Sequence, residues 1–490
     1  MRIFFILSIS IFSFSIARAQ LKQLQRLEIE IKDHDFLLIP IAEKGIMLFQ
    51  NDPSVHRKKN AWTFTRYDSA FQQKWQYTHQ IDEHFYLATY YQTASSFYVL
   101  YTKEKEIQTE FIILQFDIQT GKVNAIQDKF ITAISLKKMD YLPNHFFFGG
   151  EVDGNPIAIQ YDLQQRKSTV LTGIFNPTNE WIDMQTDTLS GVCTILLRQR
   201  QPGMPRTFCI KSYTENGDLL NQITIRTHKK NLTYGKVLPR QDGIFIIGTY
   251  SNTANLTLSH GLFITKIENE QQMFIHYYPY AQMVNMFTYL SPKKIERIKR
   301  NIETRYKKGK ESRIVFQAGM QDIIEYNNQF IYLSEFFYPK YIQSSNARGN
   351  MIGEIFEGWK YTHALICGFD RSGHLLWDNS LSINDVTKFT NEDFVRALTI
   401  HDTTCLVYNI DNDIKAKIVK QREVVKEKYV ERIQPFSSYK IIPKETTMGE
   451  AAAWYQSYFL IWGNQEIIDY EVKDKPVRKT VFYANKLKLY

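Results

Sequence analysis

One layout of about fifty residues recurs along the chain, in which a short apolar segment, a tight polar turn and a very apolar segment follow one another. The starts of consecutive very apolar segments are 51, 49, 46, 52, 86, 75 and 54 residues apart. The eight segments read GIMLFQND from Gly45, SFYVLYTK from Ser96, HFFFGGEV from His145, GVCTILLR from Gly191, GIFIIGTY from Gly243, QFIYLSEF from Gln329, TCLVYNID from Thr404 and YFLIWGNQ from Tyr458. A period of this length indicates a repeat architecture in which each unit is completed by its neighbours.

A second series of segments runs in phase with the first, and its members alternate between apolar and polar residues. They start at Trp62, Phe111, Pro156, Thr207, Leu262 and Ala364, with weaker members at Ala416 and Val481. A turn and another strand usually follow, so each unit holds about four short strands. Four antiparallel strands in such a period are typical of a β-propeller blade.

The repeat therefore predicts an all-β chain that forms a single β-propeller of eight four-stranded blades, with seven as the fallback because the last two units are irregular. The last unit has only three strands before Tyr490. We expect residues 24 to 31, LQRLEIEI, to supply its fourth strand and close the ring, because an open ring leaves strand edges exposed. The alternative is two separate all-β domains divided near residue 285.

The composition fits a large folded chain, since its 490 residues are 44% hydrophobic and 23% charged. Four cysteines cannot build a small disulfide scaffold, and no C-x-x-C pair is present. Cys193 and Cys209 fall on two predicted neighbouring strands, so a disulfide between them is one hypothesis. Two buried thiols are the favoured alternative.

Residues 1–19, MRIFFILSISIFSFSIARA, are typical of a secretory signal peptide that is cleaved before Gln20. Arg2 precedes an apolar stretch at residues 3–16, and Ala17 and Ala19 supply the small residues of the cleavage site. This stretch is too short to span a bilayer, and no run of 18 apolar residues occurs elsewhere. We expect residues 20–490 to be exported to the periplasm or the cell exterior, without a transmembrane segment.

The largest interruption of the period, at about residues 285–312, contains a predicted amphipathic helix that begins after Ser291 and Pro292 and ends at Gly309. Its apolar positions follow helical spacing and are Ile295, Ile298, Ile302 and Tyr306. Residues 293–310 hold nine Lys or Arg against two Glu, whereas the rest of the mature chain is close to neutral. A solvated helix face, a docking site for a partner and contact with an anionic membrane or polyanion are the three interpretations.

The second interruption, at about residues 338–361, is predicted to be a long loop between the second and third strands of the sixth unit. In a propeller this connection and the one that carries the helix leave the ring at the same rim, so we expect one functional surface. Aromatic residues flank both insertions, and they either recognise a partner or glycan or pack beneath their own insertion. The candidate partner-binding residues are Tyr278, Tyr280, Lys293, Lys294, Arg297, Arg300, Arg305, Tyr338 and Tyr341.

Motifs that carry chemistry are missing from the sequence. It has no H-E-x-x-H metal motif, no G-x-S-x-G nucleophile elbow and no P-loop. We therefore predict no catalytic, cofactor-binding or metal-binding residues. Nucleic-acid binding is disfavoured as well, because one basic helix lacks the distributed phosphate contacts that give affinity.

Two turns carry a resemblance to a known family. DIQTGKV from Asp117 and DRSGHLLW from Asp370 resemble the D-x-x-[TS]-G-x-x-x-W turns of pyrroloquinoline-quinone-type eight-bladed propellers. That family includes periplasmic dehydrogenases and also non-catalytic scaffolds of outer-membrane protein assembly. Only Trp377 supplies the docking tryptophan here, and no adjacent cysteine pair is present, so the resemblance implies the fold without the cofactor. The Tyr-, Phe- and Lys-rich composition with an A-x-A-Q cleavage site is similar to exported proteins of Bacteroidota.

These observations favour a non-catalytic protein-interaction scaffold of the cell envelope, which meets an envelope protein through the helix and the long loop. The alternative is a propeller enzyme, a hydrolase, lyase or quinoprotein, that acts on glycans or small alcohols. Inward-facing acids or a metal in the axial pocket would favour the enzyme. Peripheral contact with a membrane surface through the basic helix is the third reading.

Overall fold

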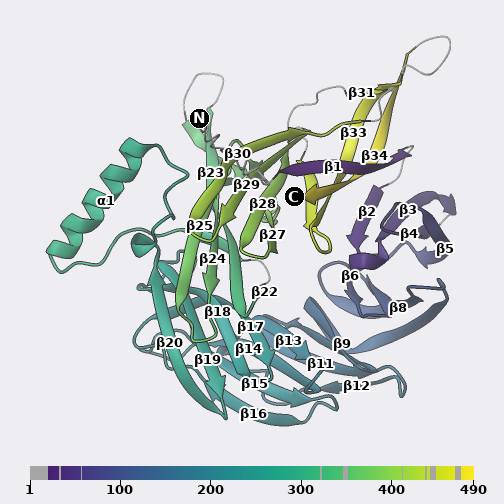
Figure 1. Cartoon of the computed structure of the whole chain (residues 1–490). Helices are drawn as coiled ribbons and strands as arrows, with labels where there is room; N and C mark the ends of the chain where they lie inside the picture. Colours follow the sequence, from purple (N-terminus) through teal and green to yellow (C-terminus); the bar gives the residue numbers. More distant parts are fainter. Residues whose placement is uncertain are drawn as a thin grey trace, which may run out of the picture.

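The computed structural model describes residues 20–31, 35–56, 58–320, 323–345, 351–410, 412–435, 439–441, 448–469 and 476–490. Residues 1–19, on which the predicted signal peptide falls, lie outside the described part. The strands form six hydrogen-bonded sheets that divide into eight four-stranded units arranged around a ring (Figure 1). The predicted eight-bladed β-propeller is thus confirmed, and its first half has the following strands, from the axis outward.

Blade 1 has β2 (Asp35–Pro40), β3 (Ile46–His56), β4 (Lys59–Tyr67) and β5 (Gln73–Asp82). Blade 2 has β6 (Phe85–Gln92), β7 (Ser96–Lys103), β8 (Gln108–Asp117) and the first part of β9 (Val123–Leu142). Blade 3 has the second part of β9, then β10 (His145–Val152), β11 (Asn155–Asp162) and β12 (Lys167–Val170). Blade 4 has β13 (Asn179–Asp187), β14 (Val192–Gln199), β15 (Thr207–Thr214) and β16 (Leu219–Thr224).

The second half of the ring holds the insertions. Blade 5 has β17 (Asn231–Arg240), β18 (Gly243–Ser251), β19 (Gly261–Glu268) and β20 (Gln271–Pro279). Blade 6 has β21 (Gln317–Met320) and β22 (Ile324–Tyr326) as its inner strand, then β23 (Gln329–Ser345), β24 (Met351–Phe369) and β25 (Leu375–Ser382), with β26 (Thr387–Lys388) beside β24. Blade 7 has β27 (Arg396–Ile400), β28 (Thr403–Ile410), β29 (Asp413–Lys420) and β30 (Glu423–Arg432). Blade 8 has β32 (Met448–Ala453), β33 (Tyr458–Asp469), β34 (Val477–Leu489) and β1 (Leu21–Glu30), with β31 (Tyr439–Ile441) beside β33. The helical elements are η1 (Ala42–Lys44), η2 (Tyr280–Gln282) and α1 (Pro292–Lys307).

The N-terminal strand closes the ring as predicted. β1 pairs antiparallel with β34, from Leu21 opposite Leu489 to Glu30 opposite Val481, and the purple strand lies against the yellow ones in Figure 1. Strands from the two ends of the described chain therefore share one sheet, which covers an edge that would otherwise be exposed.

Residue patterns along the strands explain their places in a blade. The central strand β7 is buried at every position between Phe97 and Thr102, because both of its faces lie against neighbouring blades. The outer strand β5 alternates between exposed and half-buried residues, because one of its faces meets water. Continuous apolar runs thus become the middle strands of a blade, and alternating runs become its outer strands.

The core is divided among the blade interfaces. One hydrophobic cluster lies between each pair of adjacent blades, and the cluster that joins Leu48 to Phe482 connects blade 1 with blade 8. The cluster between blades 5 and 6 runs from Leu238 to Phe369 and so crosses the division near residue 285. Two independent domains are therefore excluded.

The hypothesised disulfide is wrong, because Cys193 and Cys209 are both free and buried. Cys193 lies opposite Tyr213 on β15, whereas Cys209 lies opposite Leu197 on β14. Four residues of register separate the two thiols, which is about 13 Å along the strands and far beyond the reach of a disulfide. Burial raises the pKa of both thiols, so they behave as apolar core residues.

The predicted long loop at about residues 338–361 is also wrong. β23 and β24 continue past the blade as a paired hairpin, with Ser345 opposite Met351, and the register shifts at three points along it. Among the described residues, no helix is long and apolar enough to cross a membrane.

Candidate interaction surface

The predicted helix is confirmed as α1, which follows the strap at residues 283–290 between blades 5 and 6. Ser291 occupies the N-cap position, but its side chain makes no capping hydrogen bond, and its carbonyl oxygen instead accepts from Lys294 N at 2.9 Å. Gly309 ends the helix with φ +65°, a left-handed conformation that favours glycine. Gly309 N donates to Tyr306 O at 2.9 Å and thus satisfies one of the last carbonyl groups.

The apolar side of α1 faces the ring. Ile302 is buried in the cluster between blades 5 and 6, and Ile295 and Ile298 pack partly buried against that cluster. The strap before the helix is pinned to blade 6 by Tyr289, whose ring stacks on His363 with centroids 3.8 Å apart and planes 7° apart. These contacts attach α1 to the rim, from which it projects in Figure 1.

The opposite side of α1 is basic and exposed. Lys293, Arg297 and Arg300 lie at helical spacing on the side away from the isoleucines. Among the described residues none of these three forms an ion pair or a side-chain hydrogen bond. This charge is therefore not used to hold the fold together.

The position of these cations also costs stability. Lys293 and Lys294 lie in the first turn of α1, which contains no acidic residue. The helix dipole places partial positive charge at that end, so each cation there destabilises the helix by about 0.3–1 kcal/mol. A first turn whose cations lower helix stability, beside exposed cations that have no ion pair in the described part of the chain, fits a surface that meets an anionic partner.

The extended part of the β23–β24 hairpin, residues 338–345 and 351–358, forms the second element, which we call the arm. The arm follows β23, the second strand of blade 6, and the connection that carries α1 follows β20, the fourth strand of blade 5. The second and fourth strands of a blade end on the same side of the ring, so the arm and α1 leave the ring on that side. An isolated two-stranded hairpin is marginal in water, so the arm needs support from its side chains.

A row of aromatic rings supplies that support. Phe337, Trp359, Phe356 and Tyr341 follow one another along the arm with centroid distances of 5.5, 5.4 and 5.7 Å. Exposure rises along the row, from 4% for Phe337 to 52% for Tyr341. Each ring pair stabilises the arm by about 0.5–1.5 kcal/mol, and the outer rings stay accessible to a partner.

The structure divides the nine predicted partner-binding residues into three groups. Tyr280 is fully buried with its hydroxyl 3.0 Å from Ser259 Oγ, and half-buried Tyr278 donates to Gly373 O at 2.6 Å, so both serve packing and are corrections to the prediction. Arg305 is half-buried, and its Nε donates to Glu311 O at 2.7 Å. The remaining residues are exposed, and they are Lys293, Lys294, Arg297, Arg300, Tyr338 and Tyr341. These six exposed residues define the rim surface.

Sequence reasoning missed the residues that hold the rim surface in place. His363 is fully buried between Tyr289 and Phe336, with the ring of Phe336 at 4.6 Å, and burial lowers the pKa of His363 to about 3. Asp378 accepts hydrogen bonds from Val284 N at 3.2 Å and Asn285 N at 2.6 Å and so fixes the strap. No sequence pattern marks these contacts, because they join segments that are about 75 to 95 residues apart.

The axial region contains a cavity of about 560 Å³ that is lined mainly by the innermost strands of blades 2 to 5. Two of its residues are acids. Asp140 accepts from Thr186 N at 2.9 Å and from Tyr141 N at 2.9 Å, and Asp183 accepts from Lys138 Nζ at 2.8 Å and from Val237 N at 3.1 Å. Both carboxylates thus clamp one blade to the next, which gives them a structural use.

No group of three or more His, Cys, Asp or Glu in the described part of the chain could hold a metal ion. The two turns quoted above are tight, with Asp117 accepting from Thr120 N at 2.7 Å and Asp370 accepting from His374 N at 2.8 Å. Trp377 is 4% exposed between blades 6 and 7, and its Nε1 donates to Gln329 Oε1 at 3.2 Å.

Comparison with known proteins finds no matching family model and no matching curated protein. Among solved structures, the chain is similar to the β-propeller domain of the Trilobed protease from Pyrococcus furiosus, with 9% identity and a TM-score of 0.37 over 82% of this chain and 93% of that chain. It is similar to dihydro-heme d1 dehydrogenase NirN, with 9% identity and a TM-score of 0.44 over 92% and 73% of the two chains. It is also similar to AztD from Citrobacter koseri, with 7% identity and a TM-score of 0.40 over 90% and 98%. Similarity this low says nothing about activity, and the fold assignment stands on the sheets and interblade clusters of the chain itself.

Proposed function

We propose that this member of the β-propeller superfamily, for which the comparisons identify no closer family, is a non-catalytic interaction scaffold of the cell envelope. Its partner is an envelope protein with an acidic surface, which meets the exposed cations of α1 and the outer rings of the arm. The observation that carries the proposal is the exposed basic face of α1, whose cations Lys293, Arg297 and Arg300 form no ion pair among the described residues.

The rim surface has the composition of a protein interface. Rigid aromatic side chains and arginine are enriched at the centres of such interfaces, where they lose little entropy on binding. Tyr338 and Tyr341 are 50% and 52% exposed, and Arg297 and Arg300 are exposed on α1. The charged part would steer a partner, and the aromatic part would supply contact area.

The enzyme alternative has less support. Its acids would come from the axial cavity, where Asp140 and Asp183 both accept backbone N–H groups from the adjoining blade or strand. The hydrogen bonds of these two carboxylates join adjacent blades, so both acids have a structural role.

Attachment to a lipid surface through α1 also has less support. A helix that enters a bilayer surface does so with its apolar face, and that face of α1 packs against the ring through Ile295, Ile298 and Ile302. The outward face offers charge, and the 40% exposed Tyr306 lies on the same side of the helix as the isoleucines.

Charge reversal tests the proposal directly. The variant Lys293→Glu/Arg297→Glu/Arg300→Glu changes the net charge by the same amount as the control Lys122→Glu/Lys129→Glu/Lys167→Glu, whose residues are exposed on blades 2 and 3. We expect the control to retain the partner in cross-linking of intact cells, and the α1 variant to bind it at least about tenfold more weakly. Equal capture by both variants would contradict the proposal.

The arm is tested separately. Tyr338→Ala/Tyr341→Ala removes two exposed rings and should weaken partner binding. Loss of the Tyr341–Phe356 pair should cost the arm no more than about 0.5–1.5 kcal/mol, as measured by thermal unfolding. Binding that survives this change but is lost on α1 charge reversal would restrict the interface to the helix.

Export is tested by cell fractionation and N-terminal sequencing. Recovery of the chain in the cytoplasmic fraction, or a mature N-terminus other than Gln20, would contradict export with cleavage at that site.

A further inference from the structure

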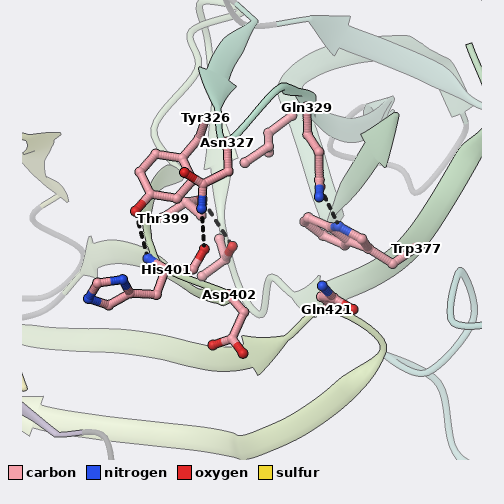
Figure 2. Close-up of a pocket in the computed structure, with 10 residues that line it drawn as sticks. Tyr326, Asn327, Gln329, Trp377, Thr399, His401, Asp402 and Gln421 are labelled. Carbon is pink, nitrogen blue, oxygen red and sulfur yellow. Dashed lines mark hydrogen bonds between the residues drawn. The ribbon is translucent and has the colours of Figure 1, made fainter. Parts of the chain in front are cut away.

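A cavity of about 340 Å³ lies between blades 6 and 7, on the rim opposite α1 and the arm. Turns between the first and second strands of a blade, and between its third and fourth strands, form that rim. Figure 2 shows the cavity with Tyr326 and Asn327 on one side, Trp377 on the other, and His401, Asp402 and Gln421 below.

Strand register relates each position of this cavity to a position between blades 5 and 6. Arg240 pairs with Gly243 across the first turn of blade 5, Tyr326 with Gln329 in blade 6, and Ile400 with Thr403 in blade 7. The third strands of blades 6 and 7 align in the same way, because Phe330 lies opposite Phe369 and the equivalent Thr404 lies opposite Val419. Arg371 and Gln421 each follow two residues after these third-strand positions. The equivalent pairs are Glu325 with Thr399, Phe330 with Thr404, Phe245 with Ile331, and Arg371 with Gln421.

Large charged and aromatic side chains fill the position between blades 5 and 6. The guanidinium of Arg371 donates to Glu325 Oε2 at 2.9 Å and to Asp242 Oδ1 at 3.2 Å. The same guanidinium lies 4.7 Å from the ring centroid of Phe330, and the rings of Phe330 and Phe245 are 4.7 Å apart. This interface is closed by contacts that use every one of those side chains.

Smaller side chains stand at all four equivalent positions between blades 6 and 7. Thr399 replaces a glutamate, Thr404 a phenylalanine, Ile331 a phenylalanine and Gln421 an arginine. The two threonine hydroxyls lie 3.0 Å apart and bond to each other instead of reaching across. The cavity therefore follows from residue choice within a shared backbone register.

The lining of the cavity mixes polar and apolar surface in similar amounts and carries little net charge. Tyr326 OH accepts from His401 N at 2.7 Å, and Asn327 Nδ2 donates to His401 O at 3.3 Å, so the walls are fixed by hydrogen bonds between the two blades. The carboxylate of Asp402 pairs with Lys420 Nζ at 2.8 Å, which neutralises it. What remains is amide, hydroxyl and ring surface.

We propose that this cavity binds an uncharged, hydroxyl-rich small molecule of monosaccharide size. The volume lies at the lower end of the range for small-molecule sites, which suits one sugar ring. The side-chain amides of Asn327, Gln329 and Gln421 offer both donors and acceptors, which matches a hydroxyl group in either role. The site is independent of the rim surface, so its failure would leave the proposed scaffold function intact.

The test transfers the filling residues from one interface to the other. The variant Thr399→Glu/Gln421→Arg installs the charged pair of the blade 5–6 interface without a change in net charge, and Thr399→Ser/Gln421→Asn is the matched control. Saturation-transfer NMR with glucose and N-acetylglucosamine should show binding to the full chain with a Kd of about 1 mM. The control should retain that binding, and the filled variant should weaken it at least about tenfold.

Charged analogues sharpen the test of ligand class. Glucuronate and glucosamine should bind more weakly than their neutral counterparts, and equal or tighter binding would overturn the assignment of an uncharged ligand. No saturation transfer from either neutral sugar, or equal transfer to the filled variant, would overturn the site. If the double variant does not fold, Thr404→Phe fills the cavity from its floor and should give the same loss.

Discussion

The two interfaces that flank blade 6 have the same backbone register, but large side chains fill one of them and smaller side chains leave a cavity in the other. Between blades 5 and 6, Arg371 lies over Phe330 and pairs with Glu325, so the space is closed. Between blades 6 and 7, Thr404 and Gln421 stand at two of the same positions, and a cavity of about 340 Å³ remains. A ring of blades therefore offers repeated positions at which residue type alone decides between a structural contact and a binding site.

The two interfaces also differ in their buried titratable groups. His363 lies on the blade 5–6 side, stacked between Tyr289 and Phe336, and Glu335 lies on the blade 6–7 side, where its Oε1 accepts from Phe394 N and Val395 N. Burial disfavours the charged form of each group, which lowers the pKa of the imidazole and raises the pKa of the carboxyl. The interfaces should therefore respond to pH in opposite directions.

The largest effect is expected from making the closed interface resemble the open one. Phe330→Thr removes a fully buried ring that packs on Phe245 and lies under Arg371. We expect a loss of about 3–4 kcal/mol in the free energy of unfolding, measured in urea. The control Thr404→Ser at the equivalent position should cost less than about 1.5 kcal/mol, and equal losses would show that the interfaces do not differ in packing.

The blade 6–7 interface should lose stability as pH rises. Burial, together with the nearby charge of Asp393, raises the pKa of Glu335 from 4.5 to about 8. The folded chain thus retains a proton that the unfolded chain releases, so stability falls between pH 4.5 and 8 by up to about 1.4 kcal/mol per pH unit. Between pH 6.5 and 8, where His363 contributes no slope, Glu335→Gln should flatten the profile, and an unchanged slope in that range would contradict the assignment.

The blade 5–6 interface should lose stability as pH falls. Burial lowers the pKa of His363 from 6.5 to about 3. Between these values the unfolded chain binds a proton that the folded chain excludes, so stability falls by up to about 1.4 kcal/mol for each pH unit below 6.5. Because the Glu335 contribution has the opposite sign over the same pH range, this test is made in the Glu335→Gln background. There His363→Phe keeps an aromatic ring in the stack and should remove the loss, as measured by the difference in unfolding free energy at pH 5 and pH 7.

A smaller effect is expected when only the charge of Arg371 is removed from the closed interface. Arg371→Gln removes the half-buried ion pairs to Glu325 and Asp242 and the contact with the Phe330 ring. We expect a loss of about 1–2 kcal/mol that shrinks at high salt, as measured by thermal unfolding at two ionic strengths. A loss that does not depend on salt would assign the effect to packing alone.

The smallest effect is expected from the reverse change. Gln421→Arg places a cation at the exposed mouth of the open interface, where Thr399 stands at the position of Glu325 and the nearby acid Asp402 is already paired with Lys420. Stability should change by less than about 0.5 kcal/mol. A gain of more than about 1 kcal/mol would mean that the cavity is a packing defect rather than a site.

Much of the architecture was predictable from the order of apolar and polar residues. Continuous apolar runs such as SFYVLYTK became central strands, and the strand at residues 24 to 31 closed the ring through β34. The helix after Ser291 was predictable from its isoleucine spacing and from Gly309. These features depend on contacts within one strand, one helix or one turn, or on the repeat itself, so local patterns reveal them.

The functional surface was only partly predictable. The cations of α1 are exposed as expected, because a helix with one apolar stripe must turn its charges outward. Tyr280 was misassigned, since its burial depends on Phe316 and Phe336, which arrive from other parts of the chain. The arm was misread as a loop because Gly, Ser and Asn near its turn mask two strands whose pairing is visible only in register.

The sequence by itself determined the propeller repeat, the closure of the ring and the basic helix, because periodicity and local charge are properties of the chain order, and it left the number of blades between eight and seven. Only the tertiary structure decided that Tyr280 and Tyr278 serve packing, that Cys193 and Cys209 stay apart, and that a cavity opens beside Thr399 and Gln421. The reason is physical: a contact between blades joins residues from separate repeats, and whether their side chains fill the space between them depends on positions that only the closed ring fixes.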